Sequence, residues 1–192
     1  MFSLISEPDS DLALVARVKD EPAAFGTLYE RYVTKIYNYV YYRTGNQHDA
    51  EDLTSRVFYR ALTHIHSYTD LGVPFSAWLY RIAHNLVANW HRDHMRRPET
   101  DLEEAVLIGP AREQPEFAAE INEKNEWLLS AIRRLPSERQ ELLILKFIEQ
   151  LSNVEIGLIM GRSEGAIKSL YHRTLLSLRE ELIGIDSNDE EE

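Results

Sequence analysis

The chain has 192 residues and no cysteine, which excludes disulfide frameworks, thiolate metal sites and cysteine nucleophiles. Hydrophobic residues make up 44% of it, enough to bury a core, and because it has neither a run of about 18 apolar residues nor a secretion signal we expect a cytoplasmic protein. The net charge of −11, taken alone, argues against a nucleic-acid partner, because attraction to phosphates dominates such binding.

Apolar residues recur at helical spacing through residues 1–97, which predicts a four-helix domain. A short first helix is expected around residues 12–18 and should end near Pro22. Three longer helices follow, and Gly45 lies where the first of them should stop. Their apolar stripes consist of Phe25, Leu28, Tyr29, Tyr32, Ile36, Tyr39 and Val40; of Ala50, Leu53, Val57, Ala61 and Ile65; and of Phe75, Trp78, Leu79, Ile82, Leu86 and Trp90.

The helical pattern is lost over residues 98–120, which predicts an acidic linker. Residues 98–126 contain nine acidic and two basic side chains, together with Pro98, Pro110 and Pro115. The segment is longer than a usual loop, so it is either a plain tether or a segment with a role of its own.

Helical spacing returns over residues 121–185, which predicts a second small domain. Ser137 and Gln140 have the spacing of a capping box, and so do Ser152 and Glu155, while Ser163 is placed to cap the last helix. That helix should bury the stripe formed by Ile167, Leu170, Thr174, Leu175, Leu178 and Leu182. The tail, residues 186–192, is too acidic and too short to fold.

Residues 152–178 have the pattern of a helix-turn-helix, in which a second helix enters the DNA major groove. Gly157 is small where the second helix should cross, and Gly161 can take the positive φ that the turn requires. The alternative is a helical hairpin with a solvated basic face. The side of the last helix opposite its apolar stripe carries possible donors to phosphates and bases: Lys168, Ser169, His172 and Arg173.

The predicted helix at residues 75–97 combines tryptophans with amides and arginines, four basic residues against one acidic. Such a surface suits unstacked bases and a single-stranded backbone. The alternative is that the tryptophans belong to the core and the arginines solvate the helix end. The residues concerned are Trp78, Arg81, Asn85, Asn89, Trp90, Arg92, Arg96 and Arg97.

Three stretches carry a resemblance to a known family: DAEDLTSRVFYRAL at 49–62, FSAWLYRIAHNLVANWHRDHMRR at 75–97, and residues 135–182 from LPSERQ to LREEL. In this order they resemble the extracytoplasmic-function (ECF) group of bacterial RNA polymerase sigma factors. The resemblance spans nearly the whole chain. It agrees with an all-α fold of two small helical bundles joined by the acidic linker, the second bundle being the helix-turn-helix.

The resemblance implies core RNA polymerase and promoter DNA as partners, and an anti-sigma factor is a common further partner in the family. The loop at 66–74 and the following helix would bind the melted minus-ten strand through Asn85 and Asn89, with Arg92 and Arg96 nearby. The last helix would bind the minus-thirty-five duplex through Lys168, Ser169, His172 and Arg173. Polymerase would bind a helix whose matching residues are Asp49, Glu51, Asp52, Leu53 and Phe58, although acids at a helix N-terminus also stabilise the helix itself.

Two other functions compete with a sigma factor. A stand-alone helix-turn-helix regulator would bind duplex DNA without polymerase, and would need an effector pocket or a dimer interface that the sequence does not declare. A metal-dependent helical enzyme is suggested by seven histidines, but Glu-x-x-His and His-Glu-x-x-His motifs are lacking. We therefore expect no catalytic residue, no metal and no cofactor.

Overall fold

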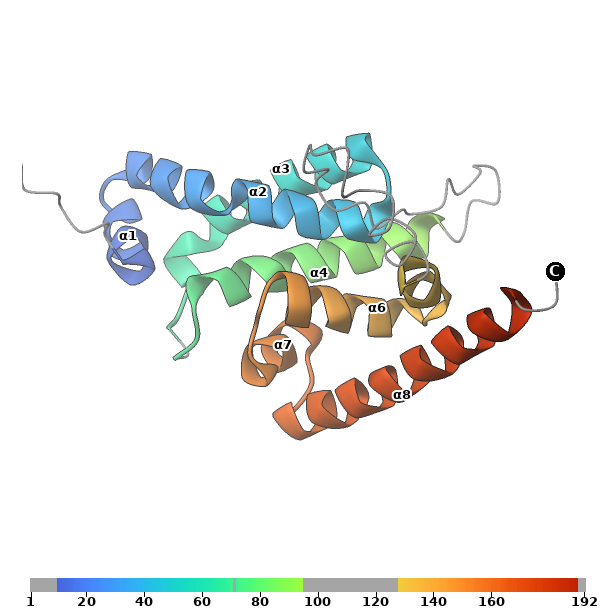
Figure 1. Ribbon diagram of the computed structural model, residues 1–192. Coiled ribbons are helices and arrows are strands. Elements are labelled where there is room, and N and C mark those ends of the chain that lie inside the picture. Colours follow the sequence, from blue (N-terminus) through green and yellow to red (C-terminus); the bar gives the residue numbers. More distant parts are fainter. Residues whose placement is uncertain (1–9, 71, 95–127, 190–192) are drawn as a thin grey trace, which may run out of the picture. The chain divides into compact units, whose positions relative to one another are not determined.

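A computed structural model describes residues 10–70, 72–94 and 128–189, and in these ranges every regular element is helical (Figure 1). Residues 128–134 are helical and precede α6. The 3₁₀ turns are η1 and η2, and η3 is a π-helix. In chain order the elements are α1 (Asp11–Val18), η1 (Pro22–Ala24), α2 (Phe25–Thr44), α3 (Gln47–His64), η2 (Ile65–Ser67), α4 (Phe75–His94), α6 (Ser137–Leu143), η3 (Ile144–Ile148), α7 (Asn153–Met160) and α8 (Glu164–Asp189).

The chain divides into two compact units, residues 1–105 and 106–192. The all-α fold in two helical domains is therefore confirmed. The predicted linker at 98–120 lies outside the described residues, as do Arg96 and Arg97, so the exact domain limits stay a prediction.

In the first unit α2, α3 and α4 pack along one another, and α1 lies at the end of the bundle where α2 begins (Figure 1). The predicted stop of α2 is confirmed, because Gly45 takes the left-handed conformation with φ 66°. Asn46 then caps α3 by accepting a hydrogen bond from the Asp49 amide at 3.1 Å. Most residues of the predicted stripes form the core, but Tyr29 is 43% exposed, and Trp78, Ile82 and Trp90 are half-buried. Side chains with no exposed surface include Leu28, Ile36, Tyr39, Val40, Ala50, Val57, Ala61, Leu79 and Ala83.

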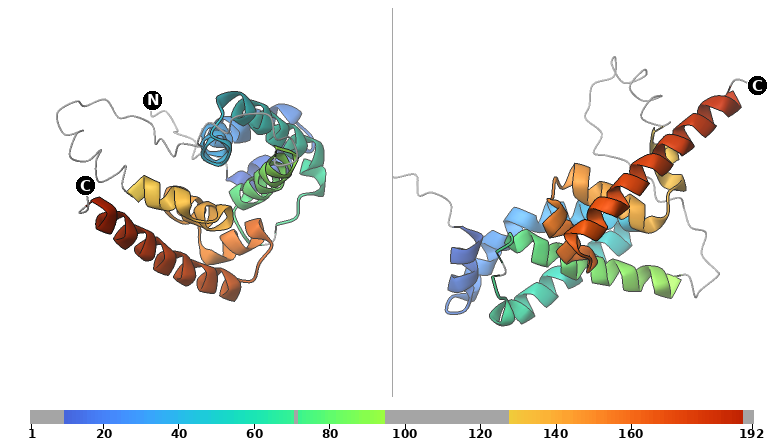
Figure 2. Two further views of the ribbon diagram at one scale, coloured as in Figure 1. Left: turned by 90° about the vertical axis from the view of Figure 1, so that its right-hand side faces the viewer. Right: turned by 90° about the horizontal axis from the view of Figure 1, so that it is seen from below.

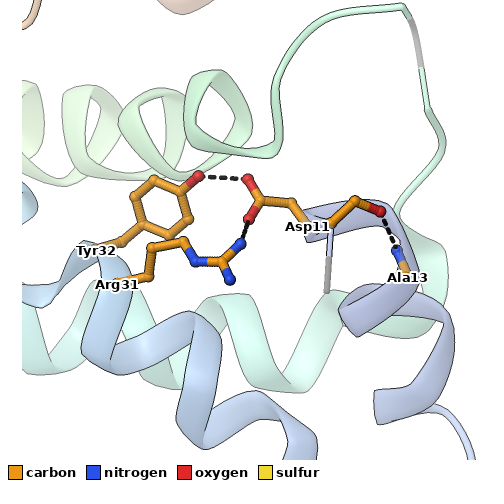
Figure 3. Close-up of polar contacts among 5 residues, drawn as sticks. Asp11, Ala13, Arg31 and Tyr32 are labelled. Carbon is orange, nitrogen blue, oxygen red and sulfur yellow. Dashed lines mark hydrogen bonds and ion pairs between the residues drawn. The ribbon is translucent and has the colours of Figure 1, made fainter. Parts of the chain in front are cut away.

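A polar cluster fastens α1 to α2. Asp11 accepts hydrogen bonds from the Arg31 guanidinium and the Tyr32 hydroxyl (Figure 3). Burial and the hydrogen bond to the Asp11 carboxylate raise the pKa of Tyr32 well above its ordinary value.

This cluster predicts an alkaline loss of stability. The folded state favours the protonated Tyr32, so its contribution to the free energy of unfolding is complete below the ordinary tyrosine pKa of about 10 and declines as the pH rises above it. Tyr32→Phe should lower stability by about 1–2 kcal/mol at pH 8 and should flatten the decline between pH 9 and 11. Urea unfolding at several pH values measures both effects, and an equally steep decline in the variant would contradict them.

The start of α6 differs from the prediction. Pro136 occupies the N-cap position and makes no side-chain capping bond, so Ser137 and Gln140 do not form the predicted capping box. The Gln140 amide instead donates to the carbonyl oxygens of Arg133, at 3.1 Å, and Leu135, at 2.7 Å. It therefore joins α6 to the preceding helix, because the unpaired carbonyls at that helix's end compete for the amide.

The helix-turn-helix is built as the sequence predicts at both caps. Ser152 and Glu155 form a complete capping box, and Gly161 ends α7 with φ 67°. Gly157 is small where the turn and the start of the second helix approach α7. A Cβ atom there would lie 2.6 Å from the carbonyl oxygen of Arg162 in the turn and 3.7 Å from the amide nitrogen of Glu164, the first residue of α8.

Gly157→Ala should therefore lower the free energy of unfolding by about 1–3 kcal/mol, because the backbone of the turn must shift. Gly165→Ala is the matched control, since a Cβ atom there meets nothing within 4 Å. Thermal unfolding of both variants gives the comparison. Equal melting temperatures would show that the turn adjusts freely.

Helix α8 packs on α7 through its N-terminal half (Figure 2). Ile167, Leu170 and Thr174 are buried, and Ser163 caps the helix by accepting from the Ala166 amide at 3.2 Å. Leu175 departs from the predicted stripe with 39% of its surface exposed. The prediction that residues 186–192 do not fold is wrong for the first four of them, because α8 continues to Asp189. Extending an existing helix needs no new nucleus, so unfavourable charge alone does not end it.

Candidate nucleic-acid interface

The basic face of α8 is exposed. The buried stripe of Ile167 and Leu170 turns Lys168, Ser169, His172 and Arg173 to the outside, as predicted. Lys168 pairs with Glu164 at 2.7 Å, and Arg173 Nε donates to the Ser169 carbonyl at 3.3 Å. Both contacts lie within one turn of an exposed helix, where they hold the cations weakly. The face can therefore offer its cations to an anionic partner.

On the first unit, Asn85 lines a hollow between the C-terminal half of α3 and the N-terminal half of α4. The hollow has a volume of about 280 Å³. Trp78 and Ile82 supply apolar walls, and the polar groups that surround them are Arg60, His64, Ser67 and Asn85. An apolar wall with several hydrogen-bonding groups is what one unstacked base requires.

Asn89 lines a second hollow, of about 270 Å³, between the N-terminal half of α3 and the C-terminal half of α4. Its side-chain oxygen accepts from Arg92 Nη2 at 2.7 Å, so the two predicted contact residues form one unit. The same hollow is lined by Asp49, Asp52, Leu53, Arg56, Leu86, Trp90, Asp93 and His94. Asn89, which is predicted to bind the strand, therefore shares a hollow with three residues predicted to bind polymerase: Asp49, Asp52 and Leu53.

The tryptophans of α4 are neither fully buried in the core nor fully exposed as a surface for bases. Trp78 is half-buried, packs against Tyr68 and Phe75 with ring centroids 5.3 and 5.4 Å away, and also lines the Asn85 hollow. Trp90 is half-buried as well, and its ring centroid lies 4.0 Å from that of His94. Both rings therefore contribute to packing and to a hollow surface.

The residues expected to bind polymerase separate into two groups. Glu51 and Asp52 are exposed and Asp49 is half-buried, so their carboxylates can meet a partner. Leu53 and Phe58 are 1% and 5% exposed and lie in the core, as the apolar stripe predicts for Leu53, and their part in polymerase binding stays a prediction. Periodicity accounts for both, since each faces the core of the bundle.

Three basic side chains of α3 were not among the predicted site residues. Arg56, Arg60 and His64 follow one another at four-residue spacing and line the two hollows. Their spacing was a usable signal, because residues four apart share one face of a helix.

Two negative observations apply to the described parts of the chain. In residues 10–70, 72–94 and 128–189 no three histidine, aspartate or glutamate side chains gather closely enough to hold a metal ion. None of the helices within these ranges is long and apolar enough to cross a membrane.

Family comparison agrees with this arrangement of two helical units. The sigma-70 region 2 family matches residues 28–97, and the sigma-70 region 4 family matches residues 125–178. The chain is 33% identical to the ECF RNA polymerase sigma factor SigW of Bacillus subtilis, over 85% of this chain and 91% of SigW. The chain belongs to the ECF sigma factors.

One further relative agrees with this assignment, and one solved structure shares the fold. The chain is 41% identical to the ECF RNA polymerase sigma factor BldN of Streptomyces coelicolor over 88% of this chain; the aligned part is 66% of BldN. The fold is also similar to that of the sigma factor RpoE from Bartonella quintana, solved with the anti-sigma factor NepR, with a TM-score of 0.62 and 22% identity over 85% of this chain and 99% of RpoE.

Membership fixes the general function. This sigma factor binds core RNA polymerase and promoter DNA and directs promoter-specific transcription initiation. A stand-alone regulator is not favoured, because both sigma regions are present in the order that initiation needs. Sigma factors are initiation factors and not enzymes.

Proposed function

We propose that the two faces bind two different states of one promoter. The α3–α4 face binds the melted minus-ten strand, with one base in the Asn85 hollow and the adjoining backbone near Asn89 and Arg92. The basic face of α8 binds the minus-thirty-five element as intact duplex through Lys168, Ser169, His172 and Arg173. The observation that carries this division is the Asn85 hollow, whose apolar wall suits an unstacked base and has no counterpart in the side chains of the α8 face.

Polymerase docking is assigned to three acids of α3: Glu51 and Asp52, which are exposed, and Asp49, which is half-buried. They lie in the first two turns, where Asn46 fixes the start of the helix. Leu53 and Phe58 support this surface from the core: the Phe58 ring lies 4.8 Å from that of Tyr29 and 6.4 Å from that of Phe25. A basic surface of polymerase is the complementary partner.

The proposed setting is the cytoplasm, where the protein acts without a catalytic residue, a metal or a cofactor. An anti-sigma factor is proposed as a further partner, because RpoE of similar fold was solved in complex with one. Such a partner would regulate access to polymerase.

Reconstitution tests the proposed function. Core polymerase is incubated with fragmented genomic DNA, with and without this protein, and the 5′ ends of the transcripts are sequenced. We expect new start sites that share two sequence elements and that depend on the protein. Binding of a specific duplex by the free protein as tightly as by the polymerase complex would instead support a stand-alone regulator.

A further inference from the structure

The strand-binding and polymerase-binding residues meet in the hollow that contains Asn89. Asp49, Asp52 and Arg56 reach it from α3, and Asn89 and Trp90 reach it from α4. Polymerase bound to α3 and a DNA strand bound to α4 would therefore both contact this hollow.

In the free protein this hollow is unfavourable for a DNA strand. Three carboxylates line it, those of Asp49, Asp52 and Asp93, against the single guanidinium of Arg56. Phosphates entering the hollow would be repelled by the carboxylates.

Arg56 is engaged with one of these acids. Its Nη1 lies 3.5 Å from the Asp52 carboxylate, and the two side chains are 54% and 66% exposed. A pair this exposed, one turn apart on a helix, contributes only about 0–1 kcal/mol. A competing cation can therefore take Asp52 away from Arg56 at little cost.

We propose that Arg56 is a further strand-binding residue, which Asp52 holds back until polymerase binds. The inference rests on the proposed function of α3 and α4. A basic group of polymerase pairs with Asp52, which removes one repelling charge from the hollow and releases Arg56. The guanidinium then donates to a phosphate of the strand that Asn89 contacts, because both residues line the same hollow. Polymerase docking would thereby increase strand affinity through one ion pair.

The test in the free, full-length protein uses a fluorescein-labelled single-stranded DNA of 12 nucleotides and random sequence, with fluorescence anisotropy. Asp52→Asn should tighten binding, since it removes a carboxylate and releases Arg56. Asp49→Asn is the matched control, because it removes a carboxylate from the same hollow without freeing Arg56. We expect the gain from Asp52→Asn to exceed that from Asp49→Asn about fivefold, and the excess to disappear in the double variant Asp52→Asn with Arg56→Ala.

The test in the polymerase complex uses the same oligonucleotide. Arg56→Ala should weaken binding about tenfold and reduce the slope of log affinity against log salt concentration by about 0.7, the value for one lost contact to single-stranded phosphate. Lys19→Ala, which removes a cation at the exposed end of α1, should leave both quantities unchanged.

Two results would overturn the inference: equal gains from Asp52→Asn and Asp49→Asn, or an excess that persists when Arg56 is absent. Failure of the proposed function gives a different pattern. In that case Asn85→Ala and Asn89→Ala would also leave strand binding by the polymerase complex unchanged.

Discussion

Replacing Arg173 by alanine should weaken binding of the polymerase complex to the minus-thirty-five duplex about tenfold. Arg173 is exposed at the C-terminal end of the basic face of α8, and its Nε donates to the Ser169 carbonyl at 3.3 Å, so the rest of its guanidinium is available to a phosphate. Loss of one phosphate contact should also lower the salt slope of duplex binding by about 1. Filter binding at 50–200 mM salt measures both.

The control for Arg173 lies on the same helix. Arg179→Ala removes the same charge from an exposed site almost two turns further along α8, beyond the predicted contact residues. It should change duplex affinity less than threefold. If both variants lost affinity equally, the binding would depend on the general charge of the helix and not on the proposed face.

Replacing Asn85 by alanine should impair strand opening and leave duplex binding nearly unchanged. Asn85 contributes an amide to the hollow lined by Trp78, and one bidentate contact to a base is worth about 1–3 kcal/mol. We therefore expect strand opening to fall about tenfold to a hundredfold, while duplex binding changes less than twofold. Permanganate reactivity of thymines in the minus-ten element measures the opening.

Asn85→Gln provides the conservative comparison for this prediction. It keeps the amide and displaces it by one methylene, so it should recover part of the opening that Asn85→Ala loses. Equal losses in strand opening and duplex binding for Asn85→Ala would refute the assignment of Asn85 to the melted strand.

Local sequence signals predicted the helices of this sigma factor well, because their caps and stripes act within a few residues. Gly45, Gly161 and the Ser152–Glu155 capping box all end or begin helices where expected. The errors arose where more distant groups compete. Gln140 bonds carbonyls of the preceding helix instead of a cap, and α8 continues through Asp186 and Asp189 because helix growth outweighs local charge.

The sequence predicted that the candidate site binds nucleic acid, but it did not predict all the residues that line the site. Periodicity and residue type identified Asn85 and the exposed face of α8. The role of α3 was incomplete, because Arg56, Arg60 and His64 reach the hollows only once α3 and α4 pack in antiparallel order. Leu53 and Phe58, which the resemblance includes among the polymerase-binding residues, are buried, because matching positions in a family do not reveal which side of a helix faces the core.

The central claim is that one face of the protein binds melted DNA and the other binds duplex. Transcription from a template whose minus-ten region is already open, with mismatched strands, tests it most directly. We expect the open template to restore most of the activity lost in Asn85→Ala and none of that lost in Arg173→Ala. Equal recovery of the two variants, or none in Asn85→Ala, would contradict the claim.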